Sequence, residues 1–109
     1  MTSIDPQIAL LQDQAGEAAG FLKLLANERR LVILCRLAAG EATVGELCDV
    51  AGLSQSAMSQ HLAKMRSDGL VEGRKDGLQV HYSIKDRRCL GILMNLKSQF
   101  CPAADVVAG

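Results

Sequence analysis

The chain has 109 residues, of which 49% are hydrophobic, 22% charged and 3% aromatic. These values exclude a disordered chain and predict one globular domain over residues 1–109, frayed at 1–5 and 102–109. The aliphatic core is thin, which favours a dimer. No apolar run approaches the roughly 20 residues that span a bilayer, and residues 1–16 lack the order of a secretion signal. A cytoplasmic protein without a membrane partner is expected.

The net charge is zero, from 12 basic and 12 acidic side chains, but the two signs are unevenly placed. Residues 1–53 hold four basic and seven acidic side chains, whereas residues 54–88 hold seven basic and four acidic ones. An excess of positive charge in one part of a domain draws an anionic partner to that face.

Asp5-Pro6 predicts the start of a first helix, because Asp accepts a capping hydrogen bond and Pro suits the first helical position. Apolar residues then recur in steps of three and four and form one stripe: Ile8, Leu11, Ala15, Ala18, Leu22 and Leu25. We expect one helix from Pro6 to Leu25 whose stripe packs either in the core or against a second subunit. Gly16 and Gly20 would let another helix approach closely.

Two further helices are predicted by their caps. Asn27 opens a helix over residues 28–39 that is apolar around most of its circumference and is therefore expected to be central and buried. Thr43 and Glu46 have the spacing of a capping box, which predicts a short helix that ends at Gly52.

Ser54 predicts the cap of a fourth helix, which ends at Gly69 and carries a buried stripe of Met58, Leu62 and Met65. The apolar period then changes to two, and residues 70–75 and 78–84 flank Asp76-Gly77, a strong hairpin signal. We expect a hairpin with one solvent-exposed face.

Asp86 predicts the cap of a last helix that runs to Phe100 and has too many apolar residues for one face, so it is expected to pack on two sides. Two short helices, a tight turn and a hairpin are the elements of a winged helix-turn-helix. The predicted fold class is mainly α with a β-hairpin wing: four helices, two strands and a fifth helix, dimerised through the first and last helices.

In that fold the second helix of the pair enters the major groove and the wing touches the flanking backbone. Double-stranded operator DNA is therefore the predicted partner. The candidate contacts are Ser54, Gln55, Ser56, Ser59, Gln60, His61, Lys64, Arg66, Arg74 and Lys75. Ser, Gln and His hydrogen bond with base edges, and Lys and Arg meet phosphates. A merely solvated helix surface is the alternative.

The sequence resembles the ArsR/SmtB family of bacterial transcriptional repressors over roughly residues 8–101. The resemblance lies in LANERRLVIL (25–34), ELC (46–48), LSQSAMSQHL (53–62) and RSDGLV (66–71). It implies a homodimer that binds a pseudo-palindromic operator and releases it when an inducer binds elsewhere.

Many members of that family bind metal ions, but this sequence departs from both usual sites. The thiolate motif keeps Cys48 and has Val50 at its second cysteine. At the last-helix site Arg88, Gln99 and Pro102 replace three of the four ligands. One remaining donor does not make a metal site, so no metal and no other cofactor is expected.

Cys35 and Cys101 match the two thiols of the family subgroup that responds to reactive sulfur species or oxidants, the BigR, SqrR and HlyU-like repressors. The resemblance implies a dithiol switch in which a disulfide or polysulfide joins the second helix to the last helix. Cys101, near a helix end, is expected to be the more exposed thiol and the first nucleophile. Cys48 and Cys89 are expected to act only as small apolar residues.

The predicted function is a non-enzymatic repressor controlled by this dithiol. Three alternatives stay open: a metal or metalloid sensor with unusual ligands, a small thiol oxidoreductase, and a constitutive architectural DNA binder. The oxidoreductase lacks a CxxC motif in this sequence.

Overall fold

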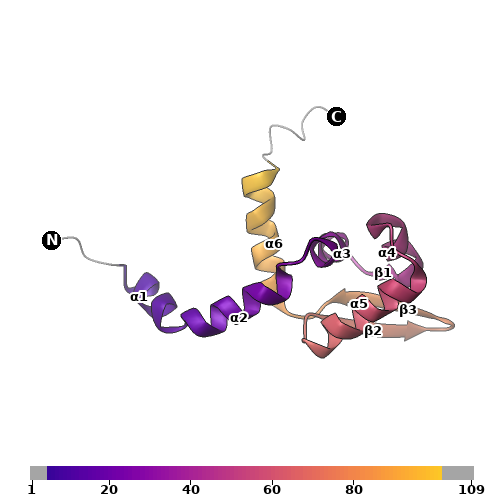
Figure 1. The fold of residues 1–109 in the computed structure, drawn as a ribbon, viewed down its shortest axis with the longest axis horizontal. Coiled ribbons are helices and arrows are strands. Elements are labelled where there is room, and N and C mark those ends of the chain that lie inside the picture. The colour runs from indigo at the N-terminus through magenta and orange to yellow at the C-terminus, as the bar shows by residue number, and fades with distance from the viewer. Residues whose placement is uncertain (1–4, 102–109) are drawn as a thin grey trace.

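The computed structural model describes residues 5–101, which form six helices and a three-stranded sheet (Figure 1). In chain order the elements are α1 (Pro6–Asp13), α2 (Ala15–Leu25), α3 (Glu28–Ala38), β1 (Ala42–Thr43), α4 (Val44–Ala51), α5 (Gln55–Ser67), β2 (Val71–Asp76), β3 (Gln79–Ile84) and α6 (Arg87–Phe100). The frayed ends expected at 1–5 and 102–109 lie outside the described residues, apart from Asp5. None of the described helices is long and apolar enough to cross a membrane.

The prediction of one helix from Pro6 to Leu25 is wrong, because the chain bends at Gln14 and forms two helices, α1 and α2. The Asp5 side chain does cap α1, at 2.7 Å from the Gln7 amide. Every residue of α1 is exposed, so tertiary packing within the chain does not hold the two segments in line. The predicted stripe reaches the core only at Leu25.

Helix α3 confirms the predicted second helix, with the Asn27 side chain accepting from the Arg30 amide at 3.1 Å. Its inner side is the centre of the core, where Ile33 and Leu34 are fully buried. The expectation that the helix is central and buried holds for this inner side, whereas Cys35 faces outward and is exposed.

The pair α4 and α5 confirms the predicted helix-turn-helix. The capping box is present: the Thr43 hydroxyl accepts from the Glu46 amide, and the Glu46 carboxylate accepts from the Thr43 amide at 2.9 Å. Gly52 ends α4 with a φ of 65°, a left-handed conformation that favours glycine. Ser54 caps α5, and the expected stripe of Met58, Leu62 and Met65 is buried.

The hairpin is present, but its turn lies one residue later than expected. Asp76 pairs with Gln79, so Gly77 and Leu78 form the two-residue turn, with φ of 65° at Gly77. The sequence did not predict β1, which pairs with β3 and makes it the central strand of the order β1-β3-β2. Strand β3 has a neighbouring strand on each side, and its residues from Val80 to Ile84 are all half-buried. The expected single solvent-exposed face is therefore not observed on β3.

The Asp86 side chain caps α6 as predicted, accepting from the Arg88 amide at 2.9 Å. Only Cys89 and Leu93 of this helix are buried in the described chain, and its far end projects from the body (Figure 1). The radius of gyration is 16.6 Å, against about 13 Å expected for a compact domain of this length. The outer helices α1, α2 and α6 account for this extension.

Candidate nucleic-acid interface and dithiol groove

Helix α5 presents most of its predicted DNA-contacting side chains to solvent. Its buried stripe points into the core, which leaves five of them exposed: Gln55, Ser56, Ser59, Gln60 and Lys64. His61 is half-buried. The Ser54 hydroxyl oxygen accepts from the Ala57 amide at 3.1 Å, so this serine works as a helix cap.

A shallow hollow of about 350 Å³ connects the wing to the start of α5. Gln55 lines it from the helix, Thr43 from the capping box, and Leu78 and Tyr82 from the hairpin. The wing therefore lies beside the amino-terminal end of α5, the arrangement in which both can meet one duplex.

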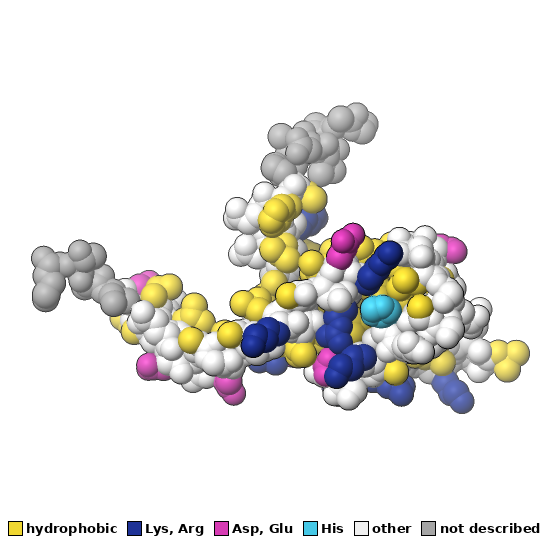
Figure 2. All heavy atoms as spheres, in the orientation of Figure 1, with side chains coloured by type: hydrophobic (Ala, Val, Ile, Leu, Met, Phe, Trp, Pro, Cys, Tyr) yellow, Lys and Arg dark blue, Asp and Glu magenta, His cyan; other side chains and the backbone are white. Residues whose placement is uncertain are grey.

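Positive charge gathers on the face that α5 crosses. Figure 2 shows Lys and Arg side chains around a histidine on this face. A polar hollow of about 310 Å³ there is lined by Arg30, Gln60, His61 and Lys64, among others. Arg66 is also exposed near the end of α5. Such clustering favours a polyanion despite the zero net charge.

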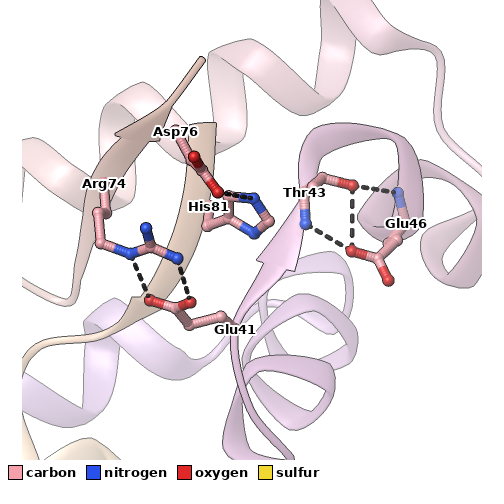
Figure 3. Close-up of polar contacts among 6 residues, drawn as sticks. All are labelled: Glu41, Thr43, Glu46, Arg74, Asp76 and His81. Atoms are coloured by element: carbon pink, nitrogen blue, oxygen red, sulfur yellow. Dashed lines mark hydrogen bonds and ion pairs between the residues drawn. The ribbon is translucent and has the colours of Figure 1, made fainter. Parts of the chain in front are cut away.

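The two basic residues of the wing differ. Lys75 is exposed and forms no ion pair with any described residue. Arg74 is also exposed but donates two hydrogen bonds to Glu41, at 2.8 and 3.2 Å (Figure 3). The hydrogen bonds from Arg74 are the main cause that lowers the pKa of the Glu41 carboxyl. No motif or local pattern in the sequence marks Glu41, which is 33 residues from Arg74.

Two arginines at the start of α3 hold the neighbouring helices. Arg29 donates to the Ala51 carbonyl at the end of α4, at 2.7 Å. Arg30 donates to the Leu24 carbonyl at the end of α2, at 2.7 Å, and to Asp68 at the end of α5, at 3.1 Å. These contacts bind the helix that carries Cys35 to both helices of the helix-turn-helix, and no pattern in the sequence predicts them.

The structure brings the two predicted sensor thiols together. Cys35 on α3 and Cys101 just after α6 both line an apolar groove of about 550 Å³ between these helices. Leu31, Leu93 and Phe100 form other parts of its wall. Both thiols are exposed, so the expected contrast between an interior Cys35 and an exposed Cys101 is not observed.

The thiols differ in their surroundings. Partial burial raises the pKa of Cys35, and the nearby charge of Cys101 raises it further. Cys89 is fully buried, and burial raises the pKa of its thiol to about 11. Cys48 is half-buried. The thiols of Cys35 and Cys101 are both accessible and line the same groove.

At the family's last-helix metal position, Arg88 pairs with Asp86 at 2.8 Å and lies over the Phe21 ring at 4.4 Å. A guanidinium in this place excludes a cation from the Asp86 carboxylate. Among the described residues, no three His, Cys, Asp or Glu side chains are grouped as metal ligands.

The sequence model described as "Bacterial regulatory protein, arsR family" matches residues 27–73. The HTH-type transcriptional regulator YgaV of Escherichia coli is 43% identical over 97 residues, 88% of this chain and 98% of YgaV. The crystal structure of the transcriptional repressor BigR from Xylella fastidiosa is 33% identical, with a TM-score of 0.79 over 93% of this chain and 98% of BigR. A homodimeric winged helix-turn-helix domain from Mycobacterium bovis is 32% identical, with a TM-score of 0.64 over 89% of this chain and 87% of that domain.

Proposed function

The chain belongs to the ArsR family of bacterial regulatory proteins, and we propose that it is a homodimeric repressor that releases operator DNA when Cys35 and Cys101 become covalently linked. As a member of this family it is a DNA-binding transcriptional regulator. One observation carries the proposed switch: two thiols 66 residues apart in sequence line a single groove between α3 and α6.

The exposed polar side of α5 supports DNA reading. Gln60 can form two hydrogen bonds with an adenine edge, and Ser56 and Ser59 can donate to or accept from either base of a pair. Lys64 and Lys75 meet phosphates on either side of the groove. Because α5 is held by its buried stripe and by Arg30, these side chains are presented on a rigid support.

Exposed apolar side chains on the outer helices support the homodimer. Leu10 and Leu11 on α1, Leu22 on α2, and Met94 and Phe100 on α6 are all exposed in the single chain. Figure 2 shows this hydrophobic surface running along the same three helices. A second copy would cover it, and the similar M. bovis domain is itself homodimeric.

An organic persulfide can supply the sulfur and the oxidising equivalents for the bridge. A cysteine thiolate attacks the outer sulfur of R–S–SH, which forms a protein persulfide and expels the thiolate R–S⁻. The second thiol then displaces hydrogen sulfide and leaves a disulfide. When both cysteines are persulfides, loss of one hydrogen sulfide leaves a trisulfide. Peroxide reaches the disulfide through a sulfenic acid, from which the second thiol displaces water.

Helix α3 connects the bridge to the DNA-reading elements. It carries Cys35 and, six and five residues earlier on the same helix, Arg29 and Arg30, which hold the ends of α4 and α5. A bridge to Cys101 draws α3 toward α6 and shifts these contacts. A hundredfold loss of operator affinity requires a coupling free energy of about 2.7 kcal/mol, within the range of known allosteric couplings.

The test compares the wild type with Cys35→Ser and Cys101→Ser before and after treatment with an organic persulfide or peroxide. Intact-protein mass spectrometry counts the sulfur atoms in the bridge, and fluorescence anisotropy measures affinity for a duplex selected from a random pool. The treated wild type is expected to lose about a hundredfold in affinity. Each serine variant should bind the duplex when reduced and keep it after treatment.

Cys48→Ser is the matched control, because Cys48 is half-buried on α4 and does not line the groove. This variant should respond like the wild type. Normal release of DNA by either Cys35→Ser or Cys101→Ser would contradict the proposal. So would a treated wild type that loses DNA without any bridge within one chain. Metal-dependent release by the reduced protein would instead favour a metal sensor.

A further inference from the structure

The two edge strands of the wing sheet are tied together by one ion pair. Glu41 immediately precedes β1, and Arg74 lies on β2. The guanidinium donates through Nε to Oε2 at 3.2 Å and through Nη2 to Oε1 at 2.8 Å, so the contact has two parallel hydrogen bonds. Figure 3 shows the pair beside His81, which is directly opposite Arg74 in the strand register.

This pair occupies one of the two N–H forks through which Arg74 could bind a DNA phosphate. Arginine binds a phosphate through the same parallel N–H fork that it uses for a carboxylate. With Nε and Nη2 bonded to Glu41, Arg74 cannot offer that fork to a phosphate at the same time. A phosphate at the remaining Nη1–Nη2 edge meets a guanidinium whose charge is already balanced by the Glu41 carboxylate. Lys75, the next residue, has no such ion pair within the described chain.

The pair is also accessible to a phosphate. The side chains of Arg74 and Glu41 are 56% and 43% exposed, and the wing strand around Arg74 is exposed from Glu72 to Asp76. An exposed ion pair contributes little to stability, because water competes well for both charges. A DNA backbone, with its dense line of negative charges, is a stronger competitor for the guanidinium than one carboxylate.

We propose that Glu41 competes with DNA phosphate for Arg74 and thereby lowers the sequence-independent DNA affinity of the wing. This rests on the proposed contact between the wing and DNA. Arg74 binds a phosphate only after the Glu41 pair opens, which occurs where other contacts already hold the duplex. A non-specific duplex therefore makes one phosphate contact fewer than the number of basic residues in the wing would allow. The ratio of operator affinity to non-specific affinity is larger as a result.

The test is Glu41→Gln, with Glu72→Gln as the matched control. Both changes remove one negative charge, and Glu72 is an exposed residue of the same wing that forms no ion pair with a described residue. Binding to a random-sequence duplex is measured between 50 and 200 mM salt. One additional phosphate contact steepens the slope of log K against log salt by about 0.9.

Glu41→Gln should therefore bind random duplex severalfold more tightly than the wild type at 50 mM salt, and this advantage should shrink about 3.5-fold by 200 mM. Glu72→Gln should raise affinity less and leave the slope unchanged. In an Arg74→Ala background, Glu41→Gln should have the same slope as Arg74→Ala alone. A circular dichroism melt of each variant separates a loss of wing structure from a change in charge.

An unchanged slope, or weaker binding by folded Glu41→Gln, would overturn the competition, because Glu41 would then be orienting Arg74 for DNA or doing neither. That result leaves the DNA-binding role standing, provided that the wild type binds duplex in a salt-dependent manner. A wild type without salt-dependent binding would overturn both the DNA-binding role and the competition.

Discussion

The central part of the molecule, α3 to β3, is complete within one chain, whereas the outer helices α1, α2 and α6 are not. Eleven of the fifteen buried hydrophobic residues in the described chain lie in the central part. Seven of the nine large hydrophobic residues that are exposed lie on the outer helices. The central part also holds the helix-turn-helix and the wing, and the groove with the two thiols lies where the two parts meet.

This difference separates two tasks. The central part presents fixed side chains to DNA, which requires a packed support. The outer helices expose apolar surface that a second chain would cover in the proposed dimer, and their arrangement would then depend on assembly. The proposed bridge between α3 and α6 would act at the border of the two parts. A small displacement of one part against the other would there change the distance between the two DNA-reading helices of a dimer.

The largest expected effect is a loss of stability in the central part. Leu62→Ala should lower the free energy of unfolding by about 2 to 5 kcal/mol, because Leu62 is 1% exposed and leaves a cavity in the core. Leu10→Ala on α1, where Leu10 is 64% exposed, should change the free energy of unfolding only through assembly. Urea unfolding over a range of protein concentrations distinguishes the two variants.

The loss in Leu62→Ala should persist at every protein concentration, whereas the loss in Leu10→Ala should disappear on dilution to monomer. A concentration-independent loss of several kcal/mol in Leu10→Ala would mean that α1 packs on its own chain in solution, and the comparison between the two parts would no longer hold.

Leu22→Glu should separate the subunits without unfolding them. Leu22 is half exposed on α2, and a carboxylate in an apolar interface loses its hydration without a partner. We expect a dimer of the wild type at low micromolar concentration and self-association of Leu22→Glu about a hundredfold weaker, or about 2.7 kcal/mol. Sedimentation velocity measures both. Leu78→Glu, at the exposed wing turn, is the control and should stay dimeric.

Within the DNA-reading elements, α5 and the wing should respond differently to truncation. Gln60→Ala should weaken binding to the selected duplex by about 1 to 3 kcal/mol and leave random duplex unaffected, since a base contact is lost. Lys75→Ala should weaken both duplexes alike and flatten the salt dependence by about one phosphate. Equal losses of Gln60→Ala on the two duplexes would show that α5 does not read bases.

Local signals in the sequence predicted most of the central part. Asn27, Thr43 and Ser54 cap the helices of the central part as expected, because a cap depends on residues only two or three positions apart. Asp86 caps the outer helix α6 in the same way. The break at Gln14 carries no such signal, since neither Gly nor Pro marks it. Strand β1 is only two residues long and therefore has no period to detect.

The sequence predicted individual residues of the site but not the contacts between them. Helix spacing placed the polar side of α5 correctly, and the resemblance to a thiol-sensing subgroup named the two cysteines that share a groove. The pairing of Arg74 with Glu41 depends on two edge strands brought together by β3, a long-range contact without a sequence pattern. The orienting role of Arg30 was missed for the same reason.

The smallest expected effect concerns the polar contacts of Arg30, which link the outer helix α2 to the central part. Arg30 donates to the Leu24 carbonyl on α2 and to Asp68 at the end of α5, and the ion pair is largely shielded, with 13% and 16% of the two side chains exposed. A shielded pair is screened by salt less than a surface pair. The same guanidinium therefore contacts the end of an outer helix and the end of the DNA-reading helix.

Asp68→Asn should lower the free energy of unfolding by about 1 kcal/mol, and a double-mutant cycle with Arg30→Gln should give a coupling energy of about 0.5 to 1 kcal/mol that persists in 1 M salt. Both are measured by urea unfolding in the Leu22→Glu monomer, with Asp49→Asn, exposed on α4, as the control. A coupling energy of zero, with equal small losses in Asp68→Asn and Asp49→Asn, would mean that the Arg30–Asp68 pair contributes nothing to the link between α3 and α5. A measurable coupling instead identifies Arg30 as a contact through which movement of the outer helices reaches α5.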